Sequence, residues 1–173
     1  MSVRSDSWIA QPVITGTDPL GYTLDSIQLL MNSATGSPAG FSVSIYSSLN
    51  GEPYNNLGNL VGSDPSAGGI FTYNASGILF SPYTRYLVVV TAATSVAQGA
   101  YSWSVVNGST IDNNWEMYPN YYNSADGSSW TEHPRQGYFQ LAIYATPIPE
   151  PETYALAGLG LTVLSFWRLR QIK

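Results

Sequence analysis

Residues 41–47 read Phe-Ser-Val-Ser-Ile-Tyr-Ser and alternate apolar with polar side chains. Successive side chains of a strand point to opposite faces, so Phe41, Val43 and Ile45 share one face and the serines and Tyr46 share the other. This pattern predicts a β-strand with one side buried.

Similar short runs recur along the chain between turn residues. The strand at residues 41–47 is preceded by residues 37–40 (Ser-Pro-Ala-Gly) and followed by Asn50-Gly51, and both segments are turn signals. Leu87–Val90 is a continuous apolar run, typical of a central strand covered on both faces. The other predicted strands are Trp8–Thr15, Tyr22–Met31, Ile70–Asn74, Tyr86–Ala92, Tyr101–Val106 and Tyr138–Thr146.

In the last of these strands, Phe139, Leu141 and Ile143 should point inward, and Gln140 and Ala142 outward. Helical periodicity is absent before Thr146. The sequence therefore predicts an all-β domain over residues 1–146, a two-sheet antiparallel sandwich with jelly-roll-like or Greek-key connections.

The amino-acid composition excludes several classes of function for this protein. Charged residues make up only 10% of the chain, and residues 1–146 hold three arginines against nine carboxylates. Nucleic-acid binding needs clustered Lys and Arg, so we expect no nucleic-acid partner. The chain has no cysteine, which excludes disulfides, thiolate metal sites and a cysteine nucleophile.

The C-terminal segment, residues 147–173, begins with a rigid spacer. Residues 147–153 read Pro-Ile-Pro-Glu-Pro-Glu-Thr, and prolines at alternate positions favour extended polyproline geometry. The domain should therefore end near Thr146, and the segment should act as a semi-rigid connection.

An uncharged segment, residues 154–167, follows the spacer. As a helix it would span about 21 Å, which is short for a hydrocarbon core of about 30 Å. We predict a short transmembrane helix that serves as a temporary anchor. The basic end, Arg168, Arg170 and Lys173, would stay in the cytoplasm and place the domain outside.

The order of these parts resembles the PEP-CTERM sorting signal of Gram-negative bacteria. Pro149-Glu150-Pro151 is followed by an aromatic-led apolar segment and then by the Arg-rich end. The resemblance implies that Pro149, Glu150 and Pro151 form a sorting motif recognised by exosortase, a membrane enzyme that cleaves the tail. It also implies delivery through an inner-membrane intermediate to the cell surface or extracellular matrix.

The ectodomain resembles the choice-of-anchor R domains of bacterial surface proteins. The resemblance rests on Trp8–Gln11, Tyr22–Ile27, Gly40–Tyr46, Tyr101–Trp103 and Phe139–Tyr144. It implies a β-sandwich without an established catalytic activity. Members usually carry residues before the equivalent of Trp8, so the first strand here could lack a partner.

Residues 1–16 contain Arg4, Asp6 and Pro12 and lack the apolar run of a secretory signal. Because the tail predicts export, we expect that Met1 is not the true start or that the chain is truncated.

Few residues offer catalytic chemistry. The single histidine, His133, lies in a Gly/Ser/Pro-rich stretch that predicts a surface loop. Glu116 and Glu132 are the candidate carboxylates of a hydrolase, although no motif joins them. We interpret both as solvated loop residues and expect no catalytic activity.

Aromatic residues gather between positions 115 and 130. Trp115, Tyr122 and Trp130, beside Asn and Asp side chains, are the candidate residues of a carbohydrate-binding site, because sugars stack on rings and bond to amides and carboxylates. The alternative is that these rings cover the core. Asp112, Asn113, Asn114 and Asp126 lack the spacing of a known calcium loop, so we predict no metal or cofactor.

The preferred hypothesis is an exosortase-sorted structural or interaction protein of the polysaccharide or biofilm matrix. The alternatives are a carbohydrate-binding module and, third, a hydrolase.

Overall fold

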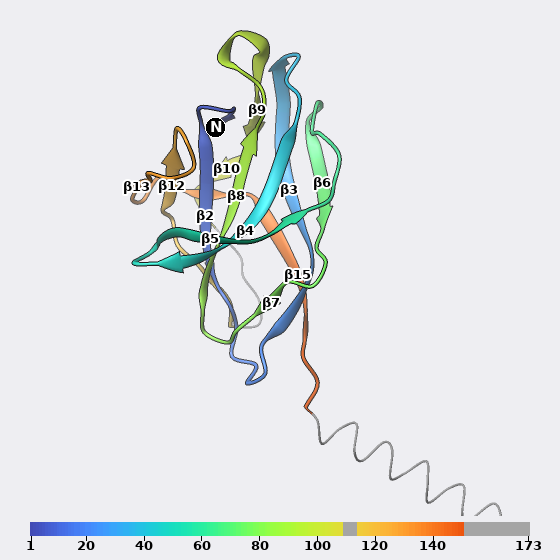
Figure 1. Ribbon diagram of the computed structural model, residues 1–173, viewed down its shortest axis with the longest axis vertical. Coiled ribbons are helices and arrows are strands. Elements are labelled where there is room, and N and C mark those ends of the chain that lie inside the picture. The colour runs from blue at the N-terminus through green and yellow to red at the C-terminus, as the bar shows by residue number, and fades with distance from the viewer. Residues whose placement is uncertain (109–113, 151–173) are drawn as a thin grey trace, which may run out of the picture.

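The computed structural model describes residues 1–108 and 114–150, and within them the chain forms two large antiparallel sheets (Figure 1). The first sheet contains β1 (Ser2–Val3), β9 (Gly99–Trp103), β3 (Tyr22–Gly36), β15 (Leu141–Pro147), β6 (Gly69–Asn74) and β7 (Leu79–Phe80). The second contains β13 (Thr131–His133), β12 (Tyr121–Ser124), β2 (Trp8–Ile14), β8 (Arg85–Ala92), β4 (Phe41–Leu49), β5 (Glu52–Leu60) and β11 (Glu116–Met117).

Two short elements complete the fold, a β10–β14 ladder (Val105–Val106 with Tyr138–Phe139) and a 3-10 turn at Val96–Gln98. The prediction of an all-β, two-sheet antiparallel fold is confirmed. The helix predicted at residues 154–167 lies outside the described residues.

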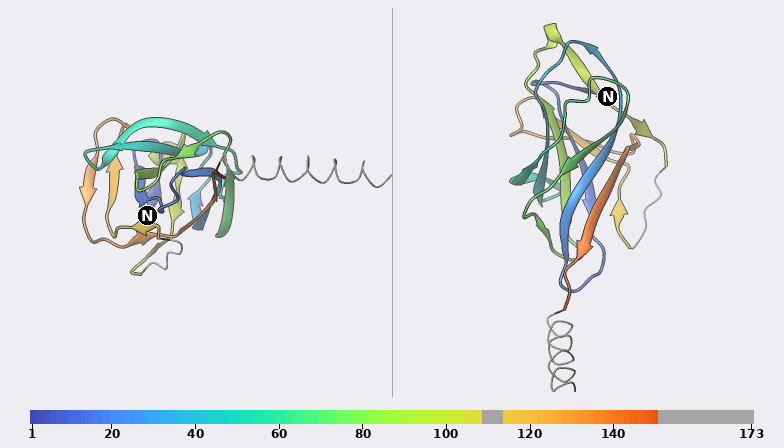
Figure 2. Two further views of the ribbon diagram at one scale, coloured as in Figure 1. Left: turned by 90° about the horizontal axis from the view of Figure 1, so that it is seen from below. Right: turned by 90° about the vertical axis from the view of Figure 1, so that its right-hand side faces the viewer.

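The main core fills the space between the two sheets, which lie on either side of it in Figure 2. Strand β3 contributes every second residue on each side of an irregularity at Asp25 and Ser26. Trp103 and Phe139 close one part of this core, with ring centroids 4.5 Å apart. Core residues from the two large sheets include Leu24, Ile27, Leu29 and Met31 of β3, and Ile9, Val43, Ile45, Val88 and Val90 of β2, β4 and β8.

Strand β8 is covered on both faces, as its apolar run predicts. Val88 and Val90 belong to the main core, whereas Leu87 and Val89 belong to a second cluster on the outer face of the seven-stranded sheet. β8 lies between β2 and β4.

The prediction that β4 is buried on one side is wrong. Val43 and Ile45 do face the main core, but Ser44 on the opposite face is only 7% exposed and Tyr46 packs on the second cluster. Ser44 Oγ donates to Asn59 Oδ1 on β5 at 2.8 Å, so its burial carries no unpaired hydroxyl.

The predicted strands Tyr101–Val106 and Tyr138–Thr146 are each interrupted. At Ser104 and Gln140 both segments change partners, since β9 and β15 pair with β3 whereas β10 and β14 pair with each other. Ser104 Oγ donates to Gln140 Oε1 at 2.7 Å and fixes this crossing. Ile143 and Leu141 point toward the core and Ala142 is exposed, as the alternation predicts.

The expectation of an unpaired first strand is wrong for these residues. β2 pairs with β8 on one side and with β12 and β11 on the other. Sequence patterns also missed β5, whose polar run Glu52–Asn56 pairs with β4 beyond the Asn50-Gly51 turn.

Candidate functional site

The last strand carries the chain from the core to the sorting motif. β15 pairs with β3 from Leu141 opposite Leu29 to Pro147 opposite Tyr22, and Thr146 Oγ1 donates to Asp25 Oδ2 at 2.8 Å. One residue further, the Ile148 amide donates to the Gly21 carbonyl at 3.0 Å. The chain is therefore held by the domain up to the residue that precedes the motif.

The motif begins at the surface. Pro149 and Glu150 are exposed. They follow β15, whose end lies at the bottom of the domain in Figure 1, away from the N-terminus. Pro151 and the basic residues Arg168, Arg170 and Lys173 lie outside the described residues. The structure therefore places two of the three motif residues.

Two loops lie at the end of the domain where the chain exits, because β15 and β7 both pair with the start of β3. The β2–β3 loop, residues 15–21, and the β7–β8 loop, residues 81–84, are joined by a Tyr83 amide to Gly16 carbonyl bond of 3.1 Å and by Thr15 Oγ1 to Ser81 O. Gly21 adopts φ +80°, and a Cβ there would collide with the Phe80 carbonyl oxygen. Glycine at this position therefore lets β7 lie against the start of β3.

The structure separates the candidate sugar-binding aromatics. Trp115 is partly buried and packs against the main core, edge-on to Tyr22 at 5.2 Å and to Phe80 at 6.0 Å. Tyr122 and Trp130 instead belong to the second cluster. Two of the three predicted rings thus share a face, and the third lies on the other side of the sheet.

Two aromatics that sequence reasoning missed join Tyr122 and Trp130. Trp8 of β2 and Tyr46 of β4 also pack, partly exposed, against the buried floor of this cluster. Trp8 lies two residues before Ala10 on β2, so the two side chains share a face, and this spacing could have predicted the position of Trp8. The buried floor consists of Ala10, Leu87, Val89 and Tyr122.

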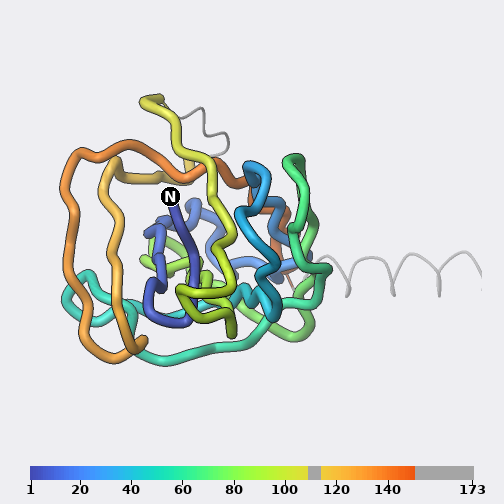
Figure 3. Tube along the Cα trace, turned by 90° about the horizontal axis from the view of Figure 1, so that it is seen from above, coloured from blue at the N-terminus to red at the C-terminus, as the bar shows by residue number. Residues whose placement is uncertain are grey.

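The β4–β5 turn reaches across this outer face. A Cβ placed on Gly51 would lie 3.0 Å from Tyr122 Oη and 3.1 Å from Arg85 Nη1. Figure 3 shows the chain around residues 50–60 and the β12–β13 hairpin curving around the same side of the molecule. Burial raises the pKa of Tyr122, and the Glu132 charge adds to the effect.

The candidate carboxylates are exposed and lie on strands rather than in loops. Glu116 is on β11 and accepts a 3.0 Å bond from Tyr118 Oη, which raises the pKa of Tyr118. Glu132 is on β13 and accepts a 2.7 Å bond from Asn120 Nδ2.

His133, predicted in a loop, ends strand β13. Its ring stacks on Tyr121 at 4.7 Å, and its Nε2 lies 2.6 Å from Asn123 Oδ1. Pairing of Tyr121 with His133 across β12 and β13 explains the stacking.

Asp126 organises the β12–β13 connection. It accepts bonds from the Ser128 and Ser129 amides at 2.9 and 3.1 Å, and these bonds lower the pKa of its carboxyl group.

Of the other candidate calcium ligands, Asp112 and Asn113 lie outside the described residues. Among the described residues, no three His, Asp or Glu side chains gather as a metal site would require.

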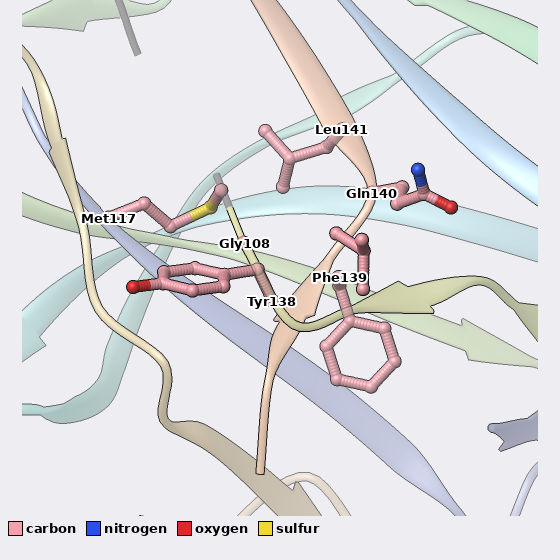
Figure 4. Close-up of a pocket in the computed structure, with 7 residues that line it drawn as sticks. Gly108, Met117, Tyr138, Phe139, Gln140 and Leu141 are labelled. Carbon is pink, nitrogen blue, oxygen red and sulfur yellow. The ribbon is translucent and has the colours of Figure 1, made fainter. Parts of the chain in front are cut away.

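A hollow of about 150 Å³ lies beside the β10–β14 ladder (Figure 4). Its wall includes Met117, Tyr138 and Leu141. Ligand sites usually enclose roughly 300 Å³ or more, so this hollow defines no ligand site.

Within residues 1–108 and 114–150, no helix is both long and apolar enough to cross a bilayer.

Comparison with known proteins gives one match. Residues 147–171 match the PEP-CTERM protein-sorting motif. No curated protein matches the chain, and no solved structure does. The motif indicates a protein that is exported, held in a membrane-anchored intermediate, recognised by exosortase and sorted to the cell surface.

Proposed function

We propose that the processed protein is a non-enzymatic structural or interaction component of the extracellular polysaccharide matrix, freed from its membrane tail by exosortase. The observation that carries the proposal is the position of the matched motif, which begins at Pro147, the last residue of β15, at the end of the described two-sheet β domain. The low charge of the domain and its many hydroxyl and amide side chains suit a hydrated glycan environment.

Matrix association can be tested by fractionation. Cells that make exosortase should carry the processed protein in the polysaccharide fraction, and a strain lacking the polysaccharide should release it into the medium. Equal distribution in the two strains would remove the matrix role and leave the sorting itself intact.

The domain is further proposed to be of the choice-of-anchor R type. Two of the segments that carry the resemblance lie in different large sheets: Phe41–Tyr46 pairs with β8, and Leu141–Tyr144 pairs with β3. This arrangement supports the assignment. A structure of an established member would test this assignment through its strand order, which should follow β13-β12-β2-β8-β4-β5 in one sheet.

A second candidate function is carbohydrate binding on the outer face of the seven-stranded sheet. Trp8, Tyr46 and Trp130 lie partly exposed over one buried floor, with Arg85 and Glu132 beside Tyr122. Ring faces next to charged and amide groups can stack on a sugar and bond its hydroxyls.

A glycan array probed with the full chain in mild detergent tests this candidate. Trp130→Ala should reduce binding at least tenfold, whereas Tyr144→Ala, which changes an exposed tyrosine on β15 of the other sheet, should bind as the parent does. Absence of binding by the parent, or equal binding by the Trp130 variant, would exclude it.

A hydrolase is the weakest alternative. A glycosidase acid needs surroundings that shield it from water and favour its protonated form. Glu116 and Glu132 are both exposed. If a hydrolase activity is found, its retention in a Glu116→Gln/Glu132→Gln variant would exclude these residues as its acid and base.

A further inference from the structure

The sorting motif and the folded domain overlap. The match begins at Pro147, which is also the last residue of β15, and Ile148 is still bonded to Gly21. No residue of free linker therefore separates the domain from Pro149. An enzyme that binds Pro149 and Glu150 must meet the end of the sandwich or detach the end of β15 from β3.

The end of the sandwich where the chain exits carries exposed apolar side chains. We call this surface the exit face and define it as Leu20, Tyr83 and Ile148. Leu20 is 40% exposed and Tyr83 is 72% exposed. Tyr83 also adopts φ 48°, a conformation that costs free energy for a residue other than Gly, Asn or Asp. The Gly16 carbonyl that accepts its amide helps to hold that conformation.

We propose that the exit face is a docking surface for exosortase, so that the enzyme recognises the folded end of the domain together with the motif. This inference rests on the proposed exosortase processing. Exposed aromatic and aliphatic side chains beside a recognised segment are the usual anchors of a protein interface.

Distance and charge favour a protein partner over the bilayer itself. From Ile148 to Tyr154, where the uncharged segment begins, the chain can extend about 20 Å at most. The exit face therefore stays close to the membrane-embedded enzyme before cleavage. Phospholipid surfaces recruit clustered Lys and Arg, whereas residues 1–146 hold three arginines against nine carboxylates.

The test measures the rate of tail removal from the full chain, exported behind a secretory leader in cells that make exosortase. Leu20→Ser/Tyr83→Asn removes both anchors, and Asn tolerates the positive φ at position 83. We expect cleavage to slow about tenfold, in line with the loss of interface anchors. The matched control, Leu49→Ser/Tyr54→Asn, changes another exposed Leu and Tyr pair, on the β4–β5 hairpin, and should be cleaved at the parent's rate.

A second variant separates docking from detachment of β15. Thr23 and Thr146 are Cα partners, so Thr23→Cys/Thr146→Cys can link β3 to β15 in a chain with no other cysteine. If the enzyme docks on the folded end, the oxidised variant is cleaved like the parent.

Two results overturn the proposal: cleavage of Leu20→Ser/Tyr83→Asn at the parent's rate, or a block of cleavage by the disulfide that reduction relieves. Failure of the parent itself to be cleaved is a different outcome, because it contradicts exosortase processing as a whole.

Discussion

At the scale of single residues, Gln11 joins three parts of the chain inside the domain. It is fully buried, its Nε2 lies 3.1 Å from Tyr118 O and 3.2 Å from Asn120 O, and its Oε1 accepts the Phe139 amide at 3.0 Å. A polar residue at an inward position of β2 is therefore required by the backbone groups around it.

Replacing Gln11 should destabilise the fold. Gln11→Leu leaves the Phe139 N–H and the carbonyls bonded to Gln11 Nε2 without this partner, and we expect a loss of about 3 kcal/mol in the free energy of unfolding. Gln28→Leu, on the outer face of β3, should change it by less than about 0.5 kcal/mol. Urea denaturation measures both values, and equal stabilities would contradict the assigned role.

Tyr73 and Tyr101 predict a loss of stability at alkaline pH. Burial raises the pKa of both phenols, and the Asp64 carboxylate, which accepts a 2.8 Å bond from Tyr101 Oη, raises them further. Both are neutral in the folded and unfolded chain below their ordinary value of 10.0, so their contribution is complete there.

Above pH 10 the unfolded chain releases these protons first, so the free energy of unfolding should fall as pH rises. Urea denaturation at several pH values should show this decline, and Tyr101→Phe should make it less steep. An unchanged stability from pH 9 to pH 11 would contradict it.

At the scale of elements, alternation and apolar runs predicted the strands that face the main core. Val43 and Ile45 of β4 and the Leu87–Val90 run of β8 are examples. Strand β5 was missed because Glu52–Asn56 has no apolar face, and only its pairing with β4 makes it extended. Local patterns do not report such a partner.

The candidate sugar site follows the alternation of the strands. Tyr122 pairs with Ala10 and so shares the outer face with Trp8, whereas Trp115 lies before β11 and faces the main core. Met117 and Tyr121, at odd positions like Trp115, also pack with the main core. The odd separation of Trp115 from Tyr122 therefore agrees with their opposite faces, but the short strands β11 and β12 that set this alternation were not predicted from the sequence.

The contact between β3 and β7 depends on Gly21. Gly21→Ala should lower the free energy of unfolding by about 3 kcal/mol, because a Cβ would collide with the Phe80 carbonyl and also disfavour φ +80°. Gly77→Ala is the matched control, since its φ is +71° but no atom lies within 4 Å of the added Cβ. It should cost about 1 kcal/mol. Equal urea midpoints for the two variants would show that the close approach is unimportant.

At the scale of the whole molecule, the chain combines a β-sandwich with a C-terminal sorting signal. The tail was predicted from sequence because its signal is linear: prolines, uncharged residues and basic residues in one order. The absence of a free linker between β15 and the motif could not be predicted, because it depends on the pairing of Pro147 with Tyr22 and on the Ile148 amide.

The motif itself should be necessary for processing. Glu150→Ala/Pro151→Ala should leave the domain folded and prevent tail removal, because Glu150 is exposed beyond the last strand. Glu52→Ala, an exposed carboxylate change on β5, is the control and should be processed normally. Normal removal of the tail from the motif variant would contradict the assignment.

The most direct test of the account is the mass and location of the full chain, exported behind a secretory leader, in cells with and without exosortase. We predict that exosortase removes a C-terminal segment containing Arg168, Arg170 and Lys173 and that the remaining domain is found at the surface or in the medium. An identical mass and an identical membrane location in both strains would contradict it.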